Sequence, residues 1–274
     1  MHQAEYPILI HAPYFSFLGF SNLINPWTAT LVVLIVIFTM FHIATHRPRW
    51  IPTGVQNFME LVLDFVSGFA EPLVGRHTAF FLPLFYWLFI FIFFSNLIGL
   101  IPGMVSPTSR VDTNVGLALI VFFSTHVWGV KVKGLKNYLA HFLPPPIPAS
   151  GNFFMRLLMK GIGLFMMVLM PVIHVVGELA KPLSLTMRLF GNLMAKEKLL
   201  AVLALLCFIF WPISLFTKAL AIVPFVLRAL IVVLGIFVSF VQAMVFMLLA
   251  MVYIGGAVQE HEHHEEEGEH VPAH

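Results

Sequence analysis

The sequence predicts an all-α polytopic membrane protein with about five membrane helices. Of its 274 residues, 59% are hydrophobic and only 10% are charged, whereas a soluble domain carries about 25% charged residues. Several uncharged runs approach or exceed the roughly 20 residues that a helix needs to span a bilayer core. The formal net charge of +2 is too small to indicate a nucleic-acid partner. The single cysteine, Cys207, excludes a disulfide framework.

We expect three parts along the chain: an N-terminal segment over 1–26, a single membrane domain over 27–258, and an acidic, His-rich tail over 259–274. The first span is expected at 27–45, where no residue is charged. Apolar residues then recur every three or four positions over 52–76, with acidic residues between them. That pattern is typical of an amphipathic helix at the membrane interface rather than a spanning one.

Two further spans follow, separated by a polar loop. Residues 79–101 carry no charge and form the clearest transmembrane segment. After the loop at 106–114, residues 115–130 return across the membrane and run directly into Lys131. The prolines that follow at 144–148 are expected to stop any helix.

The distribution of basic residues predicts the orientation. Segments 46–78 and 131–160 hold three and five Lys or Arg residues, whereas the N-terminus and the 101–114 loop together hold only Arg110. The positive-inside rule then puts the N-terminus outside and, after five crossings, the C-terminus in the cytoplasm. The chain starts without the basic region of a signal peptide, so we expect direct insertion into a bacterial inner membrane. An organelle-encoded chain would have the same kind of start.

The apolar region from 161 onward permits two interpretations. Hydropathy alone favours spans at 161–179, 199–217 and 229–257, with 180–198 as an aqueous loop. Alternatively, 161–206 forms one helix, about 69 Å long at about 1.5 Å per residue. Because a bilayer core is only about 30 Å thick, such a helix must be steeply tilted, as must the next one. The residue pattern leaves both interpretations open.

Arg188 is the most informative residue of this region. An arginine at the bilayer centre costs about 2.5–3.5 kcal/mol on insertion scales, so it indicates a functional site that needs a partner. At about 100° per residue, a stripe of polar and small residues lies within about 40° of it. The stripe consists of His174, Gly177, Lys181, Ser184, Asn192 and Ala195. Arg228, Gly235 and Gln242 share a face of the next helix in the same way.

Four motifs resemble subunit a of F-type ATP synthases. The first is Lys-Pro-Leu-Ser-Leu-Thr-Met-Arg-Leu-Phe-Gly-Asn at 181–192, and the second is Val-Gln-Ala-Met-Val-Phe-Met at 241–247. The others are Pro-Thr-Ser-Arg-Val-Asp-Thr-Asn at 107–114 and Ile-Pro-Thr-Gly-Val-Gln-Asn-Phe-Met-Glu at 51–60. They occur in the family's order and cover the chain from about residue 50 to 258.

The resemblance implies a proton-translocating stator subunit beside a ring of c subunits, each with a mid-membrane carboxylate. Two offset half-channels would bring protons to that carboxylate and take them away. The implied partners are the c-ring, the peripheral-stalk b subunits, the remaining ATP synthase subunits and the lipid bilayer. The subunit would not be an enzyme by itself, and no cofactor is expected. The family's fold also favours two long, steeply tilted last helices.

The resemblance also implies roles for individual residues. Arg188 matches the essential arginine that faces the c-ring carboxylate. The half-channel residues would be Asn192, Glu197, Gln242, His174 and Glu178. Asp112 and Asn114 match a polar loop on the side where protons enter. The chain departs from some relatives at Gly235, where they carry histidine, and at His174, where they carry an acidic residue.

Structural interpretations compete with these roles. Arg188 could be a snorkelling or loop arginine, and Glu197 could pair with a neighbouring lysine. Gln242 could form an interhelical hydrogen bond, and His174 could be a packing residue. Lys181 and Arg228 could snorkel to the interface.

Two other function classes are less consistent with the sequence. A secondary transporter would normally show internal repeats, and the two halves of this chain show none. A membrane metalloenzyme would need clustered ligands, so no metal site is expected. The histidines of the 27–258 segment are scattered, at His42, His46, His77, His126, His141 and His174. Co-purification with a c-ring would separate these classes.

Overall fold

The computed structural model describes residues 26–46, 48–101, 104–140, 153–210 and 215–259. Within them, helices follow one another in the order α2 (Pro26–His46), α3 (Val55–Val74), η2 (Gly75–His77), α4 (Thr78–Ile98), η3 (Pro107–Ser109), α5 (Val111–Ala140), α6 (Phe153–Phe210) and α7 (Leu215–Gln259). The segment before residue 26, the prolines at 144–148 and the tail from 260 lie outside the described residues.

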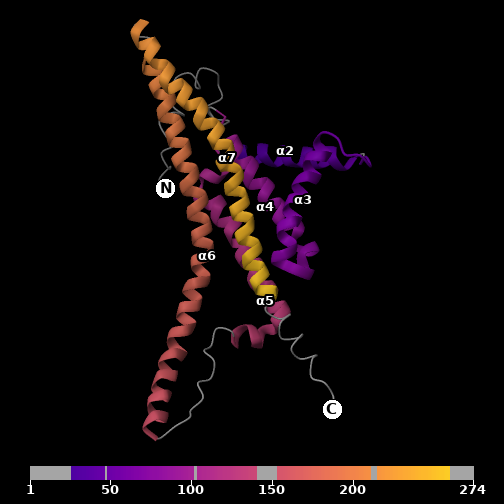
Figure 1. The fold of residues 1–274 in the computed structure, drawn as a ribbon, viewed down its shortest axis with the longest axis vertical. Helices are drawn as coiled ribbons and strands as arrows, with labels where there is room; N and C mark the ends of the chain where they lie inside the picture. The colour runs from indigo at the N-terminus through magenta and orange to yellow at the C-terminus, as the bar shows by residue number, and fades with distance from the viewer. Residues whose placement is uncertain (1–25, 47, 102–103, 141–152, 211–214, 260–274) are drawn as a thin grey trace.

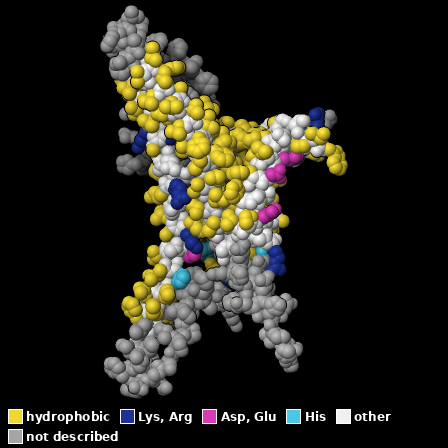
Figure 2. Space-filling view, in the orientation of Figure 1, with side chains coloured by type: hydrophobic (Ala, Val, Ile, Leu, Met, Phe, Trp, Pro, Cys, Tyr) yellow, Lys and Arg dark blue, Asp and Glu magenta, His cyan; other side chains and the backbone are white. Residues whose placement is uncertain are grey.

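Five stretches of the described chain are long and apolar enough to cross a membrane, which confirms the predicted fold class. They are Trp27–His46, Val55–Ile98, Val111–Leu135, Gly163–Cys207 and Ile222–Val258. Figure 2 shows hydrophobic side chains over most of the described surface in view, with the charged side chains few and separated. Phe38 is 69% exposed and Phe237 is 64% exposed, as expected where lipid replaces water.

Helix α3 confirms the amphipathic pattern. Its buried residues recur every three or four positions, whereas Glu60, Asp64 and Glu71 are exposed. The buried set is Met59, Val62, Val66, Ala70 and Val74. This face packs against α4 and α7. The position of α3 at the membrane interface stays a prediction.

Helices α4 and α7 form the centre of the fold. Helix α4 contacts α2, α3 and α7, and most of its residues from Phe85 to Ile98 are therefore buried. Phe85 and Ile92 of α4 and Met247 and Met251 of α7 are completely buried. Between membrane helices, close packing replaces the hydrophobic effect as the main source of association.

Helix α6 is continuous through Arg188, so the interpretation of 180–198 as an aqueous loop is wrong. Its 58 residues and the 45 residues of α7 correspond to about 87 Å and 68 Å at about 1.5 Å per residue. Both lengths far exceed the roughly 30 Å bilayer core. Figure 1 shows both helices along the longest axis of the molecule, with the short α2 lying across it. This arrangement fits a bilayer in which α2 stands upright and the long helices α6 and α7 are steeply tilted.

The structure corrects the boundaries of the third predicted span. Helix α5 begins at Val111 instead of residue 115, so Asp112 and Asn114 lie in its first turn and not in a loop. Asp112 suits a helix start because its carboxylate favours the positive end of the helix dipole. Helix α5 also continues past Lys131 to Ala140 and changes direction at Gly134, where φ is 74°. A positive φ of this kind favours glycine.

Candidate functional site

Helices α6 and α7 run antiparallel, and polar contacts link them at three levels. Lys196 of α6 meets Ser239 of α7, and Asn192 meets Gln242. Further along, the Lys181 ammonium lies 5.2 Å from the centre of the Tyr253 ring. As the residue number falls along α6 it rises by a similar amount along α7, so the register is constant. The polar stripe predicted on α6 therefore borders α7 over several turns.

Arg188 lies on this stripe at the exposed surface of α6. Its side chain is exposed, and in the described part of the chain it makes no hydrogen bond or ion pair. Its neighbours Ser184 and Gly191 are exposed too, and Met187 is 60% exposed. A guanidinium among exposed apolar residues of a membrane helix requires a partner of opposite charge. No such partner is supplied by the described residues.

Glu197 lies about 13.5 Å along α6 from Arg188, at about 1.5 Å per residue. Its Oε1 accepts a hydrogen bond from the backbone N–H of Ser106 at 3.2 Å. The carboxylate belongs to a group of polar side chains from α4, the η3 turn, α5, α6 and α7 that we call the Glu197 cluster. Its members are Ser95, Asn96, Ser106, Thr108, Asn114, Lys196, Glu197 and Ser239.

Uncharged groups hold this cluster together. The hydroxyl of Thr108 donates to Asn96 Oδ1 at 2.7 Å, and the amide of Asn114 donates to the Thr108 carbonyl at 2.8 Å. Two buried atoms of the cluster, Ser95 Oγ and Asn114 Oδ1, have no hydrogen-bond partner among the described residues. Buried polar atoms of this kind are usually satisfied by internal water. The cluster is therefore suited to hold water beside a carboxylate.

Lys196 is the charged cluster residue that sequence reasoning missed, along with the uncharged Ser95, Asn96, Ser106, Thr108 and Ser239. Its Nζ donates to the Asn96 carbonyl at 3.1 Å and to Ser239 Oγ at 3.2 Å, and not to Glu197. Gly235, where some relatives carry histidine, explains the space for the Lys196 side chain. A Cβ at this position would lie 2.6 Å from Leu100 Cδ2 and 3.4 Å from Lys196 Cδ. Glycine at this position leaves room for the lysine stem.

Asn192 and Gln242 were predicted from separate motifs, and the structure brings them together. Asn192 Nδ2 donates to Gln242 Oε1 at 2.8 Å. Gln242 is buried and Asn192 is exposed, so the pair connects the α6–α7 interior with the surface that carries Arg188. Gln242 therefore forms an interhelical hydrogen bond, and its role in transport stays a prediction.

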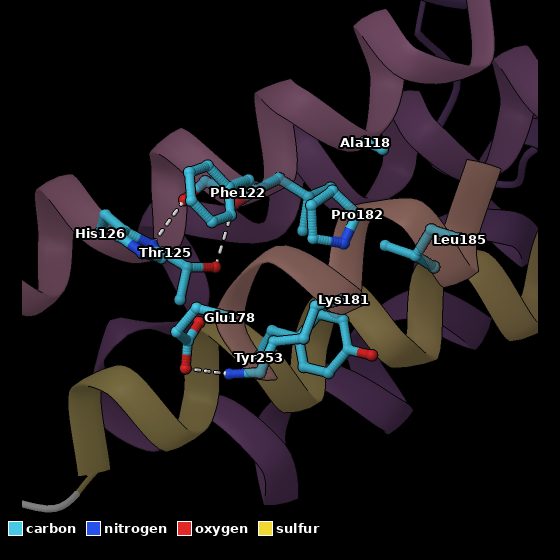
Figure 3. A pocket seen from close by; sticks show the side chains of 10 residues that line it. Ala118, Phe122, Thr125, His126, Glu178, Lys181, Pro182, Leu185 and Tyr253 are labelled. Carbon is cyan, nitrogen blue, oxygen red and sulfur yellow. Dashed lines mark hydrogen bonds and ion pairs between the residues drawn. The ribbon is translucent and has the colours of Figure 1, made fainter. Parts of the chain in front are cut away.

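A second polar region lies on the other side of Arg188, where Glu178 is about 15 Å away along α6 at about 1.5 Å per residue. Here α5, α6 and α7 enclose a pocket that we call the Glu178 pocket (Figure 3). Its lining residues are Ala118, Val121, Phe122, Thr125, His126, Glu178, Lys181, Pro182, Leu185 and Tyr253. Lys181 Nζ and Glu178 Oε1 form an ion pair at 2.5 Å.

Two predicted residues stand apart from both regions. His174 is half-buried one turn before Glu178 but does not line the pocket. Asp112 is paired with the Arg110 guanidinium at 2.5 Å, and its side chain is 67% exposed. Asn114, two residues later, is completely buried in the Glu197 cluster. The first turn of α5 therefore joins an exposed ion pair to the buried cluster.

The chain is similar to known proteins over most of its length. Residues 27–255 match the family described as ATP synthase A chain. The chain is 38% identical to ATP synthase subunit a of Trichlorobacter lovleyi over 234 residues, which cover 85% of this chain and 86% of that protein. It is 36% identical to ATP synthase subunit a of Geobacter sulfurreducens over 231 residues, or 84% and 86% of the two chains.

A third relative, ATP synthase subunit a of Geobacter sp. strain M21, is 35% identical over 255 residues, covering 93% of this chain and 94% of that protein. The family match and these relatives span the membrane helices and both polar regions. The chain therefore belongs to the ATP synthase subunit a family, the proton-translocating subunits of the ATP synthase membrane sector.

Proposed function

We propose that Arg188 is a charge barrier between two half-channels, one through the Glu197 cluster and the other through the Glu178 pocket. The observation that carries this proposal is the exposed Arg188, which has no hydrogen-bond or ion-pair partner among the described residues and lies between two polar regions on one helix. Asn192 and Gln242 lie on the Glu197 side of the barrier, and His174 lies beyond the Glu178 pocket. Asp112 and Asn114 form the outer end of the first half-channel.

The chemistry of arginine supports this assignment. A guanidinium stays protonated at any relevant pH, so Arg188 cannot itself relay a proton. It attracts a passing carboxylate in its ionised form and repels a proton that would move directly between the half-channels. Each charge that crosses gains about 2.3 kcal/mol per 100 mV. A leak past Arg188 would dissipate that energy without turning a rotor.

The partner of the Arg188 surface is the ring of c subunits. The surface around the arginine is apolar, with Leu183 and Met187 each 60% exposed, and it has the character of a helix-packing surface. A c-ring carboxylate would supply the negative charge that the described residues do not. The peripheral-stalk b subunits and the remaining ATP synthase subunits complete the assembly. ATP chemistry takes place on those other subunits, so this chain is not an enzyme by itself.

The host is a bacterial inner membrane, with the N-terminus outside and the C-terminus in the cytoplasm. The eight Lys and Arg residues in segments 46–78 and 131–160, against Arg110 alone in the 101–114 segment, support this orientation. The η3 turn and the Glu197 cluster then lie toward the outside. The α5 residues of the Glu178 pocket come after Asn114 along that helix, so the pocket lies further toward the cytoplasm than the Glu197 cluster.

The test is proton flux and ATP synthesis by the whole complex in sealed vesicles. Arg188→Ala should abolish coupled synthesis and permit passive proton leakage, because nothing then repels a crossing proton. Arg188→Lys keeps the charge but loses the planar, weakly hydrated guanidinium, so synthesis should be severely impaired with less leakage. Arg49→Ala, which removes an exposed arginine after α2, is the matched control and should behave like wild type. Full coupled synthesis in Arg188→Ala would contradict the proposed function.

A further inference from the structure

The α5 side of the Glu178 pocket carries a histidine whose bonding leaves one ring nitrogen free. His126 Nδ1 lies 3.0 Å from the Phe122 carbonyl oxygen. A carbonyl oxygen can only accept a hydrogen bond, so Nδ1 must carry the ring proton. In the neutral ring, Nε2 then holds a lone pair. Within the described part of the chain, no hydrogen bond involves Nε2.

His126 shares the pocket with the charged pair. Figure 3 shows Thr125 and His126 on the α5 side and Glu178 with Lys181 on the α6 side. Lys181 already bonds to Glu178 Oε1, whereas the Thr125 hydroxyl donates to its own helix at Val121. The pocket has room for about one water molecule. His126 therefore brings to the pocket a ring nitrogen that can accept a proton, with a place for water beside it.

The surroundings tolerate a proton on His126. The groups that face it are Glu178 and Lys181 from α6, Tyr253 from α7 and Tyr138 from α5. The Glu178–Lys181 pair has no net charge, so it does not oppose an added positive charge. Burial, and then the negative charge of Glu178, raise the pKa of the Tyr138 phenol, which therefore stays neutral.

The aromatic neighbours favour the protonated ring as well. The Phe122 ring centre lies 4.0 Å from that of His126. A cation within about 6 Å of an aromatic ring centre is attracted by the ring's quadrupole. Imidazole is also the side chain that binds and releases a proton in the neutral pH range. The site thus accommodates both states that a relay residue must adopt.

We propose that His126 is the proton-relay residue of the Glu178 pocket. Pocket water gives a proton to Nε2 as it takes one from the c-ring carboxylic acid, so the ring becomes imidazolium and the carboxylic acid becomes carboxylate. Nε2 then releases the proton to water on the cytoplasmic side and regains its lone pair. The direction follows the proton gradient. The proposal rests on the proposed function, because it assigns one step within the cytoplasmic half-channel.

The experiment measures proton flux by the complete ATP synthase in vesicles between about pH 5 and 8, where imidazole titrates. His126→Gln removes the Nε2 acceptor but keeps a polar side chain, and it should lower flux by about 10-fold or more. It should also remove the part of the pH profile due to imidazole. His42→Gln, an exposed histidine on α2, is the matched control and should leave flux and profile unchanged.

A second variant distinguishes a relay from a structural role. Free imidazole in the buffer should restore flux to His126→Ala, because it supplies the missing proton acceptor, but it should do nothing for Arg188→Ala. Wild-type flux in His126→Gln would overturn the relay. Lost flux without imidazole rescue and without a changed pH profile would overturn it too. Either result, with Arg188→Ala still uncoupled, leaves the proposed function intact, whereas coupled synthesis in Arg188→Ala overturns the proposed function itself.

Discussion

Glu197 and Glu178 lie on the same helix, on either side of Arg188, but in different surroundings. Glu197 accepts a hydrogen bond from the backbone N–H of Ser106, which is 91 residues away in sequence. Glu178 is bonded by Lys181, three residues along its own helix. The first carboxylate is held by the tertiary fold, and the second by local helix geometry.

The difference extends to the neighbours of each carboxylate. Around Glu197, groups from five segments fill the space, and a Cβ on Gly99 would lie 3.2 Å from its Oε1. Around Glu178, a pocket separates the ion pair from α5. The Glu197 carboxylate is half-buried and has no ion-pair partner among the described residues, so replacing it leaves the Ser106 N–H without its acceptor. A partly exposed pair is usually replaceable, because exposed pairs contribute only about 0–1 kcal/mol.

The strongest test of this comparison asks whether the two ends of the α5 span face opposite sides of the membrane, as the proposed half-channels require. In a background with Cys207→Ser, Val111→Cys and Leu135→Cys place single thiols at exposed positions near the two ends of the α5 span. A membrane-impermeant maleimide added to intact cells should label Val111→Cys and leave Leu135→Cys unlabelled. Inside-out vesicles should give the reverse result. Labelling of Leu135→Cys from outside would refute the proposed orientation.

The next largest effect is expected at Glu197. Glu197→Leu removes the carboxylate from the water-suited cluster and leaves the Ser106 N–H without its acceptor, so proton flux should fall by about 100-fold. Glu197→Asp keeps the charge on a shorter side chain and should lose much less. Flux measured in vesicles, with assembly of the complex as the control, decides the case. Unimpaired pumping in Glu197→Leu would reassign Glu197 to a purely structural role.

The fold class was predictable because helices that span a bilayer must be apolar, and the amino-acid composition shows long apolar runs directly. The continuity of α6 was not predictable from hydropathy, because Lys196, Glu197 and Lys198 resemble an aqueous loop on a hydropathy plot. In the structure, Lys196 instead donates hydrogen bonds to α4 and α7, and Glu197 accepts one from Ser106, just before η3. These contacts hold both polar side chains within a continuous helix.

The sequence predicted several residues that belong to the candidate site, but not which of them contact one another. Motifs indicated Arg188, Asn192, Glu197 and Gln242 individually, whereas the Asn192–Gln242 bond depends on the α6–α7 register. No sequence spacing reports that register. The Glu178–Lys181 pair is the exception, because a spacing of three on a helix does place two side chains together.

The smallest effect is expected at the Glu178–Lys181 pair. The two side chains are 26% and 34% exposed, and partly exposed pairs of this kind contribute at most about 1 kcal/mol. Glu178→Gln and Lys181→Gln should each reduce proton flux by only about 2- to 5-fold, the change that corresponds to less than about 1 kcal/mol. The double variant should be no worse than the more impaired single variant, because the interaction is lost only once. Flux and assembly of the four complexes give the coupling energy directly. A Glu178→Gln loss as severe as that of Glu197→Leu would show that both carboxylates act alike, and the contrast between the two regions would then fail.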